Sequence, residues 1–537
     1  MEDKIVTYCM ARLDRAKSLR EPFNQDWNDI RDFVRPVTVS FNSSTGQFVT
    51  VRQDTMFDGT APEALEELAS ALHSYLTNPA DRWFELQVDG DYDAMNDPEA
   101  LEWLDLVSDI IYAQYKREDA CLNQALHEVY MDLGSFGTAV LHQEWSSKNR
   151  GLSFSARPLQ HCYFLEDSEG RVDSVFMVRN WTIRQVKQEF GEVLPPKLME
   201  IKDLDRPVEV MQAVFPRSDR APGRLDAKNM RYASVWICVT TKETLSESGY
   251  ESLCYHVPRW TKLSGEIYGR GPAKKCLPDI KMLNAMERTV LKAGQKQVDP
   301  PLILANEGFL LPIRTSPGSL IFKEDEDRKI EPLRFEGNLP WAEEKSNQKR
   351  QFIEKCFYAD WIRMEKENKE MTAYEVADRR DEKLRLLSPM LGRLTSELHG
   401  PMIARSYGLL NKYGRIPTAP ASMQGKQLKV GYLSPAAVAQ LGARANQISR
   451  FMNDLIPMAQ INPGVFDIVD MDAAAQELAI ARRTPRRILR STDEINQMRE
   501  EKSKMQAMQQ LAQVAEPASK ALKNVADAQA TAGGGIA

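Results

Sequence analysis

The spacing of apolar residues along the chain predicts a predominantly helical protein with a β-rich part in its first half. Apolar residues that recur three and four positions apart are typical of helices that bury one face. In the first part of the chain this pattern predicts four helices: at residues 1–35, from the capping-box spacing at Thr60 to Asn78-Pro79, at 98–117 and at 118–133. Between 138 and 257, short β-rich runs separated by polar turns predict strands, with one helix at 182–191. Because strands and helices do not alternate strictly, the indicated fold class is α+β.

Local signals predict where several of these helices begin and end. Thr60 and Glu63 have the spacing of a capping box, in which two side chains satisfy backbone groups at a helix start. Pro79 is expected to stop the same helix. Gly134 and Gly137 are expected to end the helix that precedes the first strand.

The second half of the chain predicts two long helices that bracket a small insert. The first helix is expected at about 278–297, with Pro278 in its first turn. Residues 301–339 contain short apolar runs and an acidic turn, which predict a small β-containing insert. The second helix is expected at about 341–362, where the apolar residues form a broad stripe.

A charged stretch at 363–370 separates that helix from a leucine-rich helical pattern that runs to about residue 412. Pro389 and Pro401 are expected to kink this long helix rather than end it. One strand is expected within 414–434. Further helices are expected at 435–460, 472–483 and 492–513, and the last 25 residues predict a fraying helix and a disordered tail.

Length and charge narrow the class of protein. A chain of 537 residues is too long for one ordinary core and predicts two to four structural units. It has no run of about 18 apolar residues and no apolar segment of signal-peptide kind at its start, so no membrane span is expected and assembly in the cytoplasm is the default. The net charge of −6 argues against a protein that grips nucleic acid along its whole surface. Any contact with DNA is expected to be local or weak.

Residues that carry enzymatic or metal chemistry are scattered. The seven cysteines include no CxxC pair and are expected to be reduced, buried thiols. Cys254 and His256 come nearest to a metal pair, but nothing close in sequence completes four ligands. No GxxxxGK[ST] phosphate-binding loop is present, and the adjacent His161 and Cys162 would point to opposite faces of a strand. No catalytic residue, metal or cofactor is predicted.

Three stretches of the chain carry a family resemblance. They are FDGTAPEALEELASALHSYLTNPADRWFEL at 57–86, SGEIYGRGPAKKCLPDIKMLNAME at 264–287 and MTAYEVADRRDEKLRLLSPMLGRLTSEL at 371–398. Each stretch alone is weakly specific, but their combination, order and spacing resemble the portal, or head-to-tail connector, family of short-tailed bacteriophages. The resemblance covers nearly the whole chain.

The resemblance implies a predominantly helical portal fold with wing, stem, clip and crown. Its expected parts are a wing over 1–271, a stem helix over 272–299, a clip over 300–339, a second stem helix over 340–362, a tunnel loop over 363–371, a kinked tunnel helix over 372–412, a wing return over 413–470, and a crown with a flexible C-terminal tail over 471–537. The family assembles as a twelve-fold ring, so the chain is expected to be a ring-forming subunit, a dodecamer by resemblance.

The resemblance also implies a function and partners. A portal protein forms the channel at the unique capsid vertex, through which double-stranded DNA is packaged and later ejected. Implied partners are further copies of the chain, terminase as the packaging motor, major capsid and scaffold proteins, and a tail adaptor. The alternatives are another virion structural protein, such as a tail or scaffold component, a DNA-packaging enzyme, against which the missing phosphate-binding loop argues, and an intracellular α+β protein with no virion role.

The expected tunnel loop supplies candidate DNA contacts. Arg363, Lys366 and Lys369 are interspersed with an equal number of acidic residues, so the stretch has no net charge. Transient contacts of Lys366 and Lys369 with phosphates would let DNA pass, whereas tight pairing would hold it. The alternative is a solvated loop without a role in DNA binding.

Two more sets of residues are candidates for contacts with proteins. In the expected clip, an acidic turn faces either a basic patch on the motor or tail adaptor, or only solvent: Glu324, Asp325, Glu326 and Asp327. In the second stem helix, an apolar stripe packs either against neighbouring subunits or within its own chain: Phe352, Ile353, Phe357 and Trp361. Periodicity does not separate the two interpretations of the stripe.

Overall fold

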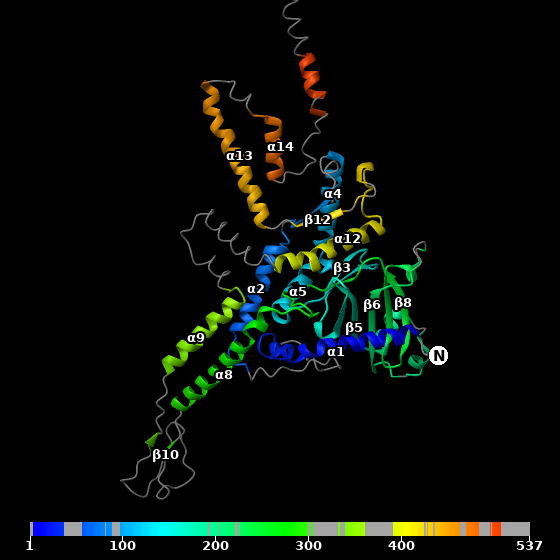
Figure 1. Ribbon diagram of the computed structural model, residues 1–537, viewed down its shortest axis with the longest axis vertical. Coiled ribbons are helices and arrows are strands. Elements are labelled where there is room, and N and C mark those ends of the chain that lie inside the picture. The colour runs from blue at the N-terminus through cyan, green and yellow to red at the C-terminus, as the bar shows by residue number, and fades with distance from the viewer. Residues whose placement is uncertain are drawn as a thin grey trace, which may run out of the picture. The chain divides into compact units, whose positions relative to one another are not determined.

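The computed structural model describes residues 4–36, 56–80, 82–88, 97–191, 194–201, 203–220, 224, 226–298, 302–303, 331–332, 339–359, 390–423, 426, 428–432, 435–461, 469–482, 494–495 and 497–505 (Figure 1). The chain divides into two compact units. The first comprises Met1–Glu85, Ser108–Pro417 and Val430–Ala437, and the second comprises Leu86–Val107, Thr418–Lys429 and Val438–Ala537. The described residues combine long helices with antiparallel sheets, which confirms the α+β class.

A five-stranded antiparallel sheet forms the β-rich part of the first unit. Its strands lie side by side in chain order: β4 (Cys162–Glu166), β5 (Val172–Thr182), β6 (Pro207–Pro216), β7 (Tyr232–Cys238) and β8 (Glu243–Tyr250). Each strand pairs with the next one along the chain, as antiparallel strands can when short connections join them. The sheet lies within residues 138–257, the stretch predicted to be β-rich, but the β-rich runs found in the sequence coincide only with β4, β5 and β7 and not with β6 or β8.

Helices pack against both faces of this sheet, and Figure 1 shows α1 (Lys4–Phe33) lying along it. α1 buries Val6, Cys9 and Leu13 against one face, together with side chains such as Met211 and Val235. The alternate positions of β6 and β7 point the other way. There they pack with α6 (Ile183–Phe190) and α7 (Pro196–Met199). The helix expected at 182–191 is therefore α6, which begins with a capping box between Thr182 and Gln185.

A smaller sheet and two packed helices also belong to the first unit. β2 (Leu141–Ser146) is the central strand between β3 (Gly151–Ala156) and β9 (Tyr255–His256). α2 (Thr60–Leu76) packs against α5 (Leu122–Phe136), and α5 also contacts β2 and β3. The helices expected at 98–117 and 118–133 are α4 (Pro98–Tyr115) and α5, with a short 3-10 turn, η2 (Glu118–Ala120), before α5.

The capping box expected at Thr60 is wrong. Gly59 is the N-cap of α2, and the Thr60 side chain makes no capping hydrogen bond. The backbone N–H of Thr60 instead donates to Asp58 Oδ1 at 3.0 Å. An aspartate just before a helix satisfies a free backbone donor as well as a threonine does, so spacing alone did not identify the side chain at the start of α2 that does so.

Gly134 also plays a different role from the one expected. α5 continues through Gly134 to Phe136 and ends at Gly137, whose φ of 78° is the left-handed conformation that favours glycine. A Cβ at Gly134 would lie 2.5 Å from Leu65 Cδ1 of α2. This glycine therefore permits the close approach of α2 and α5, and only Gly137 ends the helix.

Two long helices follow. α8 (Pro272–Val298) and α9 (Leu339–Cys356) pack side by side (Figure 1), and β10 (Leu302–Ile303) pairs with β11 (Glu331–Pro332) in the segment that joins them. This matches the expected arrangement of two helices that bracket a β-containing insert. Pro278, however, is inside α8 rather than in its first turn. Pro272 occupies the first position instead, where a missing N–H costs nothing.

Residues 390–412 are helical but contain one wider turn. A helical segment from 390 leads into a π-helical turn, η5 (Thr395–His399), and then into α12 (Gly400–Lys412). The kink expected at Pro389 lies outside the described residues. At Pro401 the helix continues, and the irregularity is the π turn that precedes it.

The last helices lie mostly in the second unit. α13 (Pro435–Ile461) and α14 (Met471–Ala481) match the helices expected at 435–460 and 472–483. Within this unit Arg444 pairs with Glu477 at 3.2 Å. The strand expected in 414–434 is β12 (Leu428–Tyr432), which pairs with β1 (Phe84–Val88). Among the described residues, no helix has the length and apolarity needed to cross a membrane.

Candidate functional site

Ion pairs join the two helices of the hairpin α8–α9. Lys349 Nζ lies 2.6 Å from Asp279 Oδ1, and Arg350 Nη2 lies 2.8 Å from Glu287 Oε1. Arg350 Nε also donates to Asp58 Oδ2 at 3.0 Å, which connects the hairpin to the start of α2. Partly exposed pairs of this kind contribute up to about 1 kcal/mol each. Both pairs join residues in the second half of α9 to the first two thirds of α8.

The apolar stripe of α9 divides between the interior and the surface. Ile353 and Phe357 are completely buried within the single chain, whereas Phe352 is 44% exposed. The interpretation of the stripe as core therefore holds for Ile353 and Phe357, since a side chain with no exposed surface offers nothing to a neighbouring subunit. Phe352 remains a candidate for an interface, and Trp361 lies outside the described residues.

A buried arginine, Arg259, forms ion pairs with two glutamates of the first unit. Arg259 lies just before the segment that leads into α8, and its side chain is 2% exposed. Its Nη2 donates to Glu397 Oε1 at 2.6 Å, and its backbone N–H donates to Glu397 Oε2 at 2.9 Å. Its Nη1 pairs with Glu166, a contact that Lys262 shares. We name Arg259, Glu397, Glu166 and Lys262 the Arg259 centre.

The Arg259 centre compensates for the burial of its charges. Burial alone lowers the pKa of Arg259, but the hydrogen bonds and charges of Glu397 and Glu166 outweigh it and raise the pKa. Carbonyl oxygens of Gly170 and Ile267 accept the remaining guanidinium N–H groups at 3.0 and 3.1 Å. All the donors of the guanidinium are therefore used, as a buried charge requires. The centre joins the turn between β4 and β5, the approach to α8 and the π turn.

The π turn that carries Glu397 has a local cause in the sequence. Pro401 has no N–H to donate to the carbonyl four residues before it, and its ring crowds that carbonyl. Gly400 closes the wider turn by donating its N–H to the Thr395 carbonyl. A Cβ at Gly400 would lie 2.9 Å from that same oxygen. The pair Gly400-Pro401 therefore accounts for the π turn, and such turns often occur at functional positions.

Beyond the π turn, α12 is fixed to the small sheet by buried polar groups. Arg405 Nε donates to the carbonyl of Gln143 in β2 at 3.1 Å. Gln143 Nε2 donates to Ser406 Oγ at 2.8 Å, and Gln143 Oε1 lies 2.8 Å from His256 Nε2. The Tyr115 hydroxyl lies 2.7 Å from Ser406 Oγ. This closed network holds α12 in one register against β2 and β9.

Acidification is expected to destabilise the first unit through its buried histidines. Burial lowers the pKa of His256 and of His399 to about 3. In the unfolded chain both titrate near 6.5, so between pH 6.5 and 3 the unfolded state binds more protons and the free energy of unfolding falls. The expected slope is about 1.4 kcal/mol per pH unit for each histidine. Thermal unfolding midpoints measured from pH 7 to 5 test this, because most carboxylates titrate below that window. His256→Gln should show a smaller slope, and an unchanged slope would contradict the assignment.

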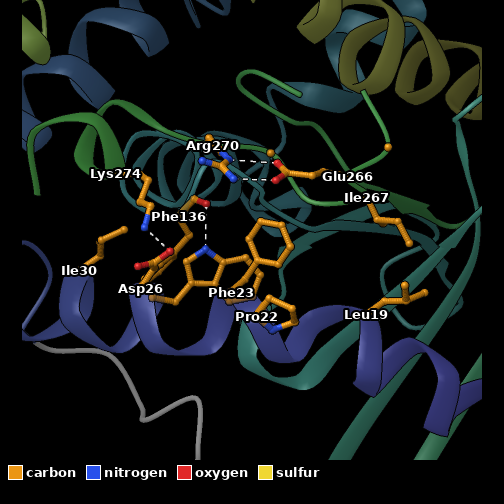
Figure 2. Close-up of a pocket in the computed structure, with 13 residues that line it drawn as sticks. Leu19, Pro22, Phe23, Asp26, Ile30, Phe136, Glu266, Ile267, Arg270 and Lys274 are labelled. Carbon is orange, nitrogen blue, oxygen red and sulfur yellow. Dashed lines mark hydrogen bonds and ion pairs between the residues drawn. The ribbon is translucent and has the colours of Figure 1, made fainter. Parts of the chain in front are cut away.

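One pocket of about 240 Å³ lies between α1 and the segment that leads into α8. Figure 2 shows Phe23 and Ile30 of α1 on one side, with Arg270 and Glu266 opposite them. Arg270 Nη2 pairs with Glu266 Oε1 at 2.6 Å, and Lys274 pairs with Asp26. The pocket therefore has an apolar floor and a rim of charges that are paired with one another.

Most of the predicted contact residues lie outside the described residues. This holds for the whole set Arg363, Lys366, Lys369, Glu324, Asp325, Glu326 and Asp327. The Arg259 centre, in turn, was not predicted from the sequence. Arg259 and Glu397 are 138 positions apart, and single charged residues of this kind have no periodicity that would distinguish them from surface charges.

The cysteine thiols are buried, with the exception of Cys121, and the described residues offer no metal site. Burial raises the pKa of the Cys162 thiol to about 12, so it is protonated at neutral pH. All seven cysteines are free thiols; Cys121 is exposed and the others are buried. Within the described ranges, no three residues among His, Cys, Asp and Glu are placed to hold a metal ion.

Comparison with known proteins adds independent findings. Residues 6–489 match the sequence family described as bacteriophage head to tail connecting protein. A protein of Bordetella phage BPP-1 named probable portal protein is 30% identical over 485 residues, which covers 88% of this chain and 86% of the relative. The portal protein of Salmonella phage epsilon15 is 25% identical over 509 residues, which covers 92% of this chain and 90% of the relative. The matched residues include the hairpin α8–α9 and the whole Arg259 centre.

Proposed function

Since the chain belongs to the family of bacteriophage head-to-tail connecting proteins, we propose that it is the portal protein at the capsid vertex of a phage. Its place is in the virion, at the junction of head and tail, where it contacts both. The observation that carries this conclusion is the family match over residues 6–489, together with portal-named relatives aligned over most of their length. The family is structural rather than catalytic, so the chain is a component of the channel and not the packaging enzyme.

In this proposal, copies of the chain close head to tail into a ring, by family resemblance a dodecamer. Such an interface is heterologous, because one face of each copy meets a different face of the next. Double-stranded DNA passes along the axis during packaging and ejection. The ring assembles in the host cytoplasm with scaffold and major capsid proteins, then docks terminase and afterwards the tail adaptor.

The described elements support an assignment of parts. α8 and α9 are the stem helices, and the segment between them, which contains β10 and β11, is the clip. The five-stranded sheet with α1 belongs to the wing. The Arg259 centre fixes the stem side of the wing to the helix that leads from the tunnel loop. The crown is the C-terminal part of the chain from residue 471.

Two of the proposed contacts concern residues outside the described ranges. Lys366 and Lys369, with Arg363, are proposed to touch DNA phosphates transiently as the duplex moves through the tunnel loops. The acidic turn from Glu324 to Asp327 is proposed to meet a basic patch on the motor or the tail adaptor.

Electron microscopy of the purified protein tests the proposed function. The expected result is a ring with an axial opening wide enough for a DNA duplex, at a mass that corresponds to about twelve copies. Sizing chromatography with light scattering measures the copy number independently. A protein that remains a single subunit at all concentrations and salt conditions, or an oligomer without an axial opening, would contradict the proposal.

A further inference from the structure

Two cysteines lie on facing sides of the helices α8 and α9. Cys276 belongs to the second turn of α8, and Cys356 is the last residue of α9. We propose that these two side chains form an oxidisable dithiol, which a small peroxide converts to a disulfide that crosslinks the two helices. The reaction belongs to the folded single chain, so the inference goes beyond the ring proposed above and does not depend on it.

The positions of the two cysteines on their helices bring the thiols together. Cys276 precedes Asp279 by three residues in α8, and Cys356 follows Lys349 by seven residues in α9. These spacings correspond to about one and about two helical turns, so each cysteine lies on the same side of its helix as the charged residue. Asp279 and Lys349 pair across the two helices at 2.6 Å. The cysteines therefore lie on the sides of α8 and α9 that face each other.

The two thiols are in contact and are held there by packing. Cys276 and Cys356 are hydrogen-bonded to each other through their side chains. Cys276 is completely buried, and Cys356 is 8% exposed. Ile353, about one turn before Cys356, and Phe357, which follows it, are also completely buried. Close packing on this side of α9 leaves the sulfur atoms little freedom to move apart.

The two thiols differ in reactivity. The hydrogen bond from Cys276 and the positive charge of Lys275 lower the pKa of Cys356 to about 7. Burial and the charge of Asp279 act in the opposite direction but do not outweigh them. The same hydrogen bond, together with burial, raises the pKa of Cys276. Cys356, which retains some exposed surface, is therefore partly thiolate at neutral pH, the form that reacts with oxidants, while Cys276 stays protonated beside it.

The proposed reaction is balanced by one molecule of peroxide. The Cys356 thiolate attacks one oxygen of hydrogen peroxide and the O–O bond breaks, which gives a sulfenic acid and a hydroxide that takes up the proton released by the thiol. The Cys276 sulfur then attacks the Cys356 sulfur. The S–O bond breaks, and the hydroxyl group leaves as water with the proton of Cys276. Two thiols are thereby oxidised to a disulfide, and the peroxide is reduced to two molecules of water.

A disulfide at this place would constrain the whole hairpin α8–α9. It closes a loop from residue 276 to residue 356, which contains most of both helices together with β10 and β11. A crosslink that closes a long loop restricts the unfolded chain and so stabilises the folded one. The oxidised protein is therefore expected to unfold at a higher temperature. Amides in the first turns of α8 and the last turns of α9 should also exchange more slowly with solvent.

A second explanation assigns these cysteines a packing role only. Free cysteine is a small apolar residue that fills space between helices well. In that case peroxide does not reach the pair in the folded protein, and Cys121, the exposed cysteine, reacts first. The experiment must therefore show which thiols react while the protein is folded.

Peptide mass spectrometry of the full-length protein makes this distinction. The reduced protein is treated with hydrogen peroxide at neutral pH, and the remaining thiols are then blocked with N-ethylmaleimide under denaturing conditions. The expected product is a crosslinked pair of peptides that contains Cys276 and Cys356 and is lost on reduction with dithiothreitol. The thermal unfolding midpoint should rise on oxidation and return to its first value on reduction.

Three variants assign the roles of the thiols. In Cys276→Ala the sulfenic acid at Cys356 has no partner to attack it, so dimedone should label it and oxidation should no longer raise the unfolding midpoint. In Cys356→Ala the protonated thiol of Cys276 should stay unlabelled. The matched control Cys121→Ala removes the exposed thiol and should leave the crosslink unchanged. Circular dichroism monitors folding, and if a variant does not fold, the peptide analysis of the unchanged protein still decides.

Three results would overturn the inference. In the first, peroxide oxidises Cys121 while Cys276 and Cys356 both remain available to N-ethylmaleimide. In the second, the crosslink between Cys276 and Cys356 forms only in the denatured chain. In the third, the oxidised protein contains disulfides through Cys121 alone. None of these results depends on whether the protein forms rings, so the inference and the proposed function are tested separately.

Discussion

Replacing Gly137 with alanine is expected to destabilise the first unit by more than about 3 kcal/mol, because two costs combine at this position. The φ of Gly137 is 78°, in the left-handed region that is unfavourable for a residue with a Cβ. The added Cβ would also lie 2.2 Å from the backbone nitrogen of Gly271. Backbone atoms cannot rotate away as a side chain can, so the segment before α8 would have to move. The thermal unfolding midpoint of the purified variant measures the loss.

Two other glycines serve as controls for this substitution. Gly191 has a φ of 87°, and a Cβ added there would have no neighbouring atom within 4 Å, so Gly191→Ala reports conformational strain alone. Gly294 lies inside α8 with equally open surroundings, and Gly294→Ala should stabilise the helix by up to about 1 kcal/mol. If Gly137→Ala costs no more than Gly191→Ala, the close approach to Gly271 is unimportant.

Glu397→Ala is expected to cost about 3 kcal/mol of unfolding free energy. Removal of one partner from a buried ion pair leaves an uncompensated charge, which typically costs about 3–5 kcal/mol. The lower end applies here because Glu166 remains beside Arg259. Chemical or thermal unfolding of the variant measures the change. Hydrogen exchange of the amides in the π turn should also rise, because Glu397 fixes that turn to Arg259.

Two comparisons test the explanation. Glu397→Gln keeps the shape and part of the hydrogen bonding, so its cost should be smaller. Glu169→Ala removes an exposed pair with Arg171 and should cost less than about 1 kcal/mol. An equal effect of Glu397→Ala and Glu169→Ala would show that the Arg259 centre contributes little to stability.

Periodicity predicted the helices well because it depends on which residues are buried. The apolar positions of α1, such as Cys9 and Leu13, are those that meet the five-stranded sheet. The two helices and the insert of the second half could also be predicted from the sequence. Prolines and a change from helical periodicity to short apolar runs mark their boundaries. Helix starts were less predictable. Several residue types can satisfy the first backbone donors of a helix, and at α2 the side chain that does so is Asp58 rather than Thr60.

Contacts between distant residues were not predictable from one sequence. Gly134 looked like a helix terminator, because the sequence does not show that Leu65 packs against it. Periodicity did not show whether the apolar stripe of α9 packs within its own chain or against neighbouring subunits. Burial places Ile353 and Phe357 in the core of the single chain. Arg259 and Glu397 resemble ordinary surface charges until the fold brings them together. The candidate contacts of the tunnel loop and clip remain predictions.

The position of α1 in the chain has a consequence for biosynthesis. α1 leaves the ribosome before the strands on which its apolar residues pack, which include Phe176 and Val235. At a translation rate of about 5–20 residues per second, Val6 and its neighbours wait roughly 10–50 seconds for those partners. During that interval the nascent helix exposes its apolar side to other chains. A ribosome-associated chaperone that shields it should raise the yield of correctly folded protein.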